Sequence, residues 1–236
     1  MKIHGLNGLT LLDYPGKMAC TVFTGHCNFR CPFCHNASLV LNPDSQPVIS
    51  EDEVFTLLKT RSGRLEGVAI TGGEPTLSDD LPVFCEKIKN MGLSVKLDTN
   101  GSRPDMIKSL VTAHLIDYIA MDIKASPDNY GKATGLKNFC MDPIFESVDT
   151  IMDYSSKGLI DYEFRTTVVE GIHSEKDFLR IGHWLKGAKA YYLQGYKPSD
   201  EQLDPTGLST VPVNIMERYR TLLLPDIPNT FLRGVV

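Results

Sequence analysis

Short runs of β-forming residues alternate with segments of helical periodicity along the chain. The β-rich runs lie at 19–23, 68–70, 94–97, 118–121, 162–169 and 190–193. Such alternation predicts an α/β fold in which parallel strands are joined by crossover helices. A doubly wound sheet and an open, incomplete barrel both fit about six of these units, and both place active residues at the carboxyl ends of the strands.

Helix start signals stand between the β-rich runs. Ser50 and Glu53 form a capping-box pattern, and Ser174 and Asp177 begin another segment with helical spacing. A last helix, at roughly 213–224, is expected to close the chain.

Composition narrows the class of protein. The chain has 236 residues, 42% of them hydrophobic and 22% charged, as in a soluble globular protein, and we expect one domain over residues 1–236. The net charge is −5 and the basic residues are scattered, so neither nucleic acid nor an anionic membrane is an expected partner. We find no secretory signal at the start and no apolar run of about 18 residues, which predicts a cytoplasmic protein.

Three cysteines, Cys27, Cys31 and Cys34, follow the first β-rich run at close spacing. In a reducing compartment, clustered cysteines favour metal or redox chemistry over a disulfide framework. The remaining cysteines stand alone, at Cys20, Cys85 and Cys140.

Several chemistries use part of this pattern. Cys31 and Cys34 alone resemble a thiol–disulfide pair, and with His35 they match a c-type haem attachment site. Zinc could take three thiolates and a histidine, and three buried cysteines could also be inert. However, a thiol–disulfide exchange protein has no use for Cys27. Covalent haem attachment usually accompanies export, and a structural zinc knuckle usually has a second ligand pair far along the chain. Three thiolates suit a [4Fe–4S] cluster with one iron left open.

Further motifs follow in a recognisable order. Cys-x₃-Cys-x₂-Cys contains an aromatic residue, Phe33, before its last cysteine. Thr-Gly-Gly-Glu-Pro at 71–75 follows the second β-rich run, Asp-Thr-Asn-Gly at 98–101 the third, and Asp-Ile-Lys at 122–124 the fourth. Together they resemble the radical S-adenosylmethionine (SAM) superfamily. The segment 11–17, Leu-Leu-Asp-Tyr-Pro-Gly-Lys, is most similar to activating proteins of anaerobic ribonucleotide reductases.

The resemblance implies a partial (β/α)₆ open barrel and a site for two cofactors. It implies that one [4Fe–4S] cluster is held by the three cysteines, and that SAM binds the open iron. Asp98 and Asp122 would hold a monovalent cation, and Lys124 would meet the methionine carboxylate of SAM. The residues implied to contact the cofactors are Phe33, Gly72, Gly73, Glu74, Asp98, Asn100, Asp122, Lys124 and Arg165.

Two positions depart from the family pattern. Thr24-Gly25-His26 precedes the first cysteine where Gln-Gly is more usual, and Tyr196 stands where pyruvate formate-lyase activase has histidine. His35 is expected near the adenine of SAM or as a cap on local backbone.

The resemblance implies an enzyme that makes a glycyl radical on a partner, most closely an anaerobic ribonucleoside-triphosphate reductase. A flavodoxin- or ferredoxin-like protein would supply electrons. The alternatives are a radical SAM enzyme for a small molecule, such as a 7-carboxy-7-deazaguanine synthase, and a cytosolic thiol–disulfide protein using Cys31 and Cys34. Segments 125–136 and 197–210 are expected to border the barrel mouth.

Overall fold

A mostly parallel sheet runs through the protein in the computed structural model, which describes residues 1–199 and 201–235. Each strand pairs in parallel with the next one in the chain from β2 to β7, as the alternation predicted. These strands are β2 (Ala19–Thr24), β3 (Gly67–Gly72), β4 (Ser94–Thr99), β5 (Tyr118–Asp122), β6 (Asp161–Glu170) and β7 (Tyr191–Gly195).

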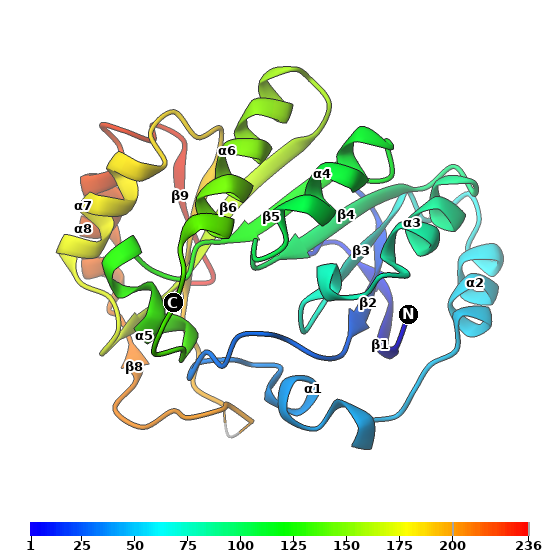
Figure 1. Cartoon of the computed structure of the whole chain (residues 1–236), viewed down its shortest axis with the longest axis horizontal. Coiled ribbons are helices and arrows are strands. Elements are labelled where there is room, and N and C mark those ends of the chain that lie inside the picture. Colours follow the sequence, from blue (N-terminus) through cyan, green and yellow to red (C-terminus); the bar gives the residue numbers. More distant parts are fainter. Residues whose placement is uncertain (200, 236) are drawn as a thin grey trace.

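Helices cover the outer side of this curved sheet, in an arc from α2 to α8 (Figure 1). The two expected capping boxes are confirmed, at Ser50 with Glu53 and at Ser174 with Asp177. Six parallel strands with helices on their outer side confirm the expected partial (β/α)₆ barrel. The longer helices are α2 (Glu51–Thr60), α3 (Leu81–Lys89), α4 (Pro104–Thr112), α6 (Asp142–Ser156), α7 (Glu175–Trp184) and α8 (Val213–Leu223).

The hydrophobic core lies between the sheet and the helices. Val22, Ile70 and Leu97 on three neighbouring strands are completely buried, and so are Leu110 of α4 and Ile151 of α6. Burying a side chain of this size stabilises a fold by about 1.5–3 kcal/mol. This packing fixes the strands, and hence the positions of the loops at their carboxyl ends.

Three strands were not predicted. β1 (Ile3–Thr10) pairs antiparallel with β2, and its glycines and asparagine disfavour a strand in isolation. β8 (Ser209–Thr210) pairs with β6. The expectation that a helix closes the chain is wrong, because β9 (Thr230–Arg233) follows α8 and extends the sheet beside β7. Strands of two or four residues are too short to show a period in sequence.

The long loop after β2 runs along the open side of the sheet. Figure 1 shows this blue segment passing from β2 to the neighbourhood of α5 (Tyr130–Thr134) and returning to α1 (Ala37–Leu41). The loop carries the three clustered cysteines.

Candidate active site

A pocket at the carboxyl ends of the strands contains all of the residues that the sequence placed in the site. Their roles there stay predictions, but their convergence is a feature of the fold, since they come from five different strand–loop units. The predicted residues that line it are Cys27, Cys31, Phe33, Cys34, Gly72, Gly73, Glu74, Asp98, Asn100, Asp122, Lys124 and Arg165.

Hydrogen bonds from several elements fix the cysteine loop. The Arg30 N–H donates to the Thr134 carbonyl at the end of α5, at 2.8 Å. The Pro32 carbonyl accepts from the Asp204 N–H at 2.9 Å, and the Asn36 side chain donates to the Gly72 carbonyl at 2.8 Å. Residues far apart in sequence therefore hold the loop against the mouth of the barrel.

The cysteine thiols face the same pocket and are partly or wholly buried. Burial raises the pKa of Cys27, and it raises the pKa of Cys31 to about 12, although Lys124 opposes the shift at Cys31. Among the residues that the structure describes, no group of three His, Cys, Asp or Glu side chains is placed to hold a single metal ion. A cubane cluster distributes its thiolates over different irons, so three thiols around one pocket fit a cluster.

The glycine pair after β3 packs against the backbone of the cysteine loop. The Gly73 N–H donates to the Thr24 carbonyl at 2.8 Å, and the Glu74 N–H donates to the His26 carbonyl at 2.7 Å. A Cβ atom on Gly73 would lie 1.9 Å from that His26 oxygen. Glycine is therefore required for the approach of two backbone segments.

We expect Gly73→Ala to destabilise the protein by at least about 3 kcal/mol, because the clash is with backbone that cannot rotate away. Gly182→Ala is the matched control, since a Cβ there would meet its nearest atom at 3.4 Å in helix α7. Urea unfolding of both variants measures the difference. An equal midpoint for the two variants would contradict the tight approach at Gly73.

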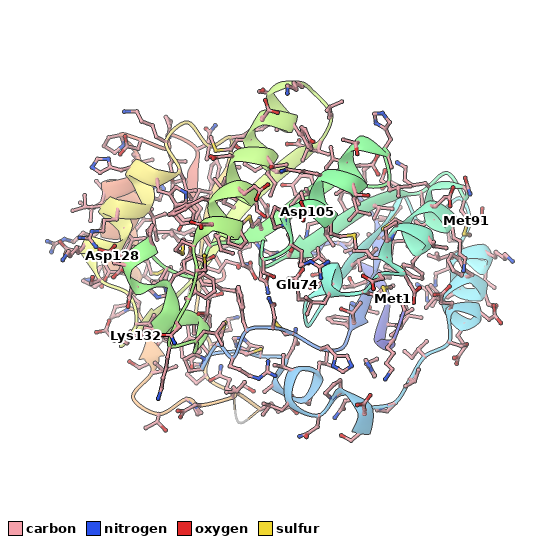
Figure 2. The ribbon with its side chains drawn as sticks, in the orientation of Figure 1. Met1, Glu74, Met91, Asp105, Asp128 and Lys132 are labelled. Atoms are coloured by element: carbon pink, nitrogen blue, oxygen red, sulfur yellow. The ribbon has the colours of Figure 1, made fainter. Side chains whose placement is uncertain are left out.

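Glu74 is buried near the middle of the molecule, where Figure 2 labels it. Its carboxylate accepts from the Thr76 N–H at 3.1 Å, from the Thr99 hydroxyl at 2.7 Å and from the Asn100 N–H at 2.6 Å. Burial raises the pKa of Glu74, and these donors oppose that shift. Glu74 thus ties the end of β3 to the end of β4; its contact with SAM stays a prediction.

Arg165 on β6 bridges the two aspartates of the pocket. Its guanidinium donates to Asp98 at 3.1 Å and to Asp122 at 3.0 Å. Asp122 also accepts from Lys124 at 2.9 Å. In this arrangement the chain's own cations balance both carboxylates. A monovalent cation on Asp98 and Asp122 stays a prediction, and it requires Arg165 to release at least one of them.

The charge of Asp122 is held by its neighbours. Burial by itself would raise the pKa of this carboxyl, but Arg165 and Lys124 outweigh burial and lower the pKa to about 2. An ionised aspartate is stabilising above its unfolded-state pKa of about 4 and loses that contribution as the pH falls toward its folded-state pKa.

We therefore expect Asp122 to contribute about 2 kcal/mol of stability that is constant above about pH 5 and lost between about pH 4 and pH 2. Unfolding by urea at a series of pH values measures it, with Asp122→Asn as the comparison. If the wild type and this variant lose stability in parallel over that range, the ion pairs with Arg165 and Lys124 do not stabilise the ionised form of Asp122.

Some residues of the site were missed in the sequence. Thr167 lies two residues after Arg165 on β6 and lines the pocket, and Lys96, two residues before Asp98 on β4, is buried behind the pocket and pairs with Asp98. Both follow the two-residue period that places side chains on one face of a strand, and this period could have identified them.

The segment after β7 contacts the cysteine loop through polar groups. His35 Nε2 is 2.8 Å from the Lys197 carbonyl, and Gln202 accepts from the Tyr196 hydroxyl at 2.5 Å. Gln202 Nε2 is also 3.3 Å from His35 Nε2. Lys197 and Gln202 of the segment 197–210 thus contact the cysteine loop. That the whole segment borders the barrel mouth stays a prediction, and Asp200 lies outside the described residues. The predicted proximity of His35 to adenine is not tested by these contacts.

Comparisons with known proteins show the family of the chain. The family model described as the radical SAM superfamily matches residues 21–183. Protein MJ1227 of Methanocaldococcus jannaschii, whose name describes a glycyl-radical enzyme activating enzyme, is 31% identical over 199 residues, which are 84% of this chain and 81% of that protein. The chain belongs to the radical SAM superfamily.

Two further comparisons extend this result. The pyruvate formate-lyase-activating enzyme of Clostridium pasteurianum is 27% identical over 157 residues, covering 64% of each chain. The crystal structure of QueE from Escherichia coli aligns with a TM-score of 0.57 at 13% identity, over 99% of this chain and 93% of that one. The second likeness concerns the fold alone.

Within the described residues, no helix has the length and apolar character needed to cross a bilayer.

Proposed function

We propose that this protein is an activating enzyme that removes a hydrogen atom from a backbone glycine of a large partner enzyme. Cys27, Cys31 and Cys34 would hold one [4Fe–4S] cluster, with SAM at the open iron. A single radical SAM domain over residues 1–236 would carry this activity. When bound, the cluster and SAM together supply a 5′-deoxyadenosyl radical.

The observation that carries the proposal is the shared pocket. Three thiols, a glycine-rich strand end and a set of paired charges line one cavity at the carboxyl ends of parallel strands. Enzymes built on barrels of parallel strands place their chemistry at this end. The names of two relatives, from M. jannaschii and C. pasteurianum, describe activating enzymes and support the same class of reaction.

The chain's own residues would bind and orient SAM. The stretch from Gly72 through Glu74 would accept hydrogen bonds from the methionine amino group of SAM, and the Lys124 ammonium would pair with the methionine carboxylate. Lys124 is suited to this because it lies in the pocket beside a carboxylate that could release it. The aromatic ring of Phe33, which is buried in the cysteine loop, would exclude water from the site.

We propose an anaerobic ribonucleoside-triphosphate reductase as the partner, on the resemblance of segment 11–17 to its activating proteins. A flavodoxin- or ferredoxin-like protein would deliver electrons one at a time.

Electron paramagnetic resonance of the partner tests this function. The reconstituted, reduced protein is mixed anaerobically with SAM and with the purified large subunit of a reductase encoded nearby. We expect a glycyl-radical signal on the large subunit, and no signal when its radical glycine is replaced by alanine.

Other outcomes assign the protein elsewhere. SAM cleavage without a radical on any glycyl-radical partner would reject the activase function and favour a small-molecule radical SAM enzyme, such as a 7-carboxy-7-deazaguanine synthase. A protein that binds no iron under strict anaerobiosis would reject both and favour thiol–disulfide chemistry at Cys31 and Cys34.

A further inference from the structure

Asn100, at the end of β4, is held in one orientation. Its backbone N–H donates to the buried carboxylate of Glu74 at 2.6 Å, and its side-chain oxygen accepts from the Ser102 backbone N–H at 2.9 Å. A flip of the amide would turn the NH₂ group toward the Ser102 N–H, placing donor against donor. The side-chain nitrogen of Asn100 therefore has a fixed direction.

That side-chain nitrogen points at Cys27, the first cysteine of the cysteine loop. It lies 3.7 Å from Cys27 Sγ and also donates to the Asn28 side-chain oxygen at 2.9 Å. Asn100 is only 5% exposed, so water competes weakly for this contact. Cys27 Sγ accepts a second hydrogen bond, from the Phe29 N–H at 3.4 Å. The end of β4 thus supplies an N–H donor to a sulfur that the sequence assigns to the cluster.

We propose that Asn100 is a positioning residue that donates a hydrogen bond to the Cys27 thiolate and thereby raises the reduction potential of the cluster. This inference rests on the proposed function, since it needs the cluster to be present. Reduction adds negative charge to the cluster and its thiolates. A hydrogen bond to a ligand sulfur stabilises the more negative state more strongly, so the cluster becomes easier to reduce.

The proposed role differs from a structural one. The bond between the Asn100 oxygen and the Ser102 N–H shapes the turn after β4, and the loss of a turn contact would lower stability without changing the potential. The Cys27 contact acts on the charge of the sulfur, so its loss changes the potential of the cluster in a folded protein.

The test is a redox titration of the reconstituted protein without SAM, followed by electron paramagnetic resonance of the reduced cluster. Asn100→Ala removes the donor. Asn100→Asp has the same shape and keeps the oxygen for Ser102, but it loses the NH₂ group and adds a negative charge. Ser147→Ala is the matched control, because it removes a buried hydrogen bond to the Gly101 carbonyl of 2.6 Å in the same turn and leaves Asn100 intact.

We expect a more negative midpoint potential in Asn100→Ala, a shift at least as large in Asn100→Asp, and the wild-type value in Ser147→Ala. Wild-type potentials in both Asn100 variants would overturn the inference while the proposed function stands. A wild-type protein without a cluster would overturn both.

A measurement on the wild type covers the case in which the variants lose the cluster. With asparagine labelled by ¹⁵N at the side-chain amide, pulsed resonance of the reduced cluster should show a coupling to this nitrogen, and the coupling should persist in Ser147→Ala. Absence of the coupling in the cluster-loaded wild type would refute the hydrogen bond.

Discussion

Replacing Cys27 with alanine should abolish SAM cleavage and leave an incomplete cluster in the reconstituted protein. The same loss is expected for Cys31→Ala and Cys34→Ala, because each thiolate is predicted to hold a different iron. Cys27 is the informative position, since a thiol–disulfide exchanger would use Cys31 and Cys34 alone. Iron and sulfide content, visible absorption and 5′-deoxyadenosine formation measure the effect.

Cys140→Ala is the control for this series. Cys140 is exposed and does not line the pocket, so its removal should leave cluster content and SAM cleavage at the wild-type level. A Cys27→Ala protein that retains the full cluster and cleaves SAM would show that another residue is the third ligand.

Replacing Arg165 with leucine should destabilise the protein by about 3 kcal/mol and weaken SAM binding. Removing one partner of a buried ion pair typically costs about 3–5 kcal/mol, because the remaining charge is left uncompensated. Asp98 and Asp122 each keep a lysine, Lys96 and Lys124, so the lower end of that range applies. Arg165 also holds both carboxylates at fixed positions in the pocket, and leucine cannot replace that contact.

Arg165→Lys separates charge from geometry. Lysine keeps the positive charge but cannot donate to both aspartates through a planar fork, so it should recover part of the stability and less of the SAM affinity. Anaerobic urea unfolding and equilibrium binding of SAM measure the two effects. Unchanged stability in Arg165→Leu would mean that the bridge contributes nothing to the fold.

The sequence predicted the parallel strands and the pocket well, for a physical reason. Buried parallel strands and capped helices carry strong local signals, as at Ser50 and Ser174. Motifs that follow successive strands meet at one edge of the sheet, so Asp98 and Asp122 had to lie close together once the strand order was known.

Contacts that depend on three-dimensional packing could not be predicted. β1 becomes a strand because β2 offers it a partner, although its own residues disfavour one. The bridge from Arg165 to both aspartates depends on the register of three strands, and the contact of Asn100 with Cys27 joins residues 73 apart in sequence. Local patterns contain neither kind of information.

The fate of one hydrogen atom tests the central claim most directly. The partner reductase is made with α-deuterated glycine and mixed anaerobically with the reduced protein and SAM. We predict that the 5′-deoxyadenosine formed carries one deuterium and that a glycyl radical appears on the partner in equal amount. Unlabelled 5′-deoxyadenosine, formed with no radical on the partner, would contradict the proposed function.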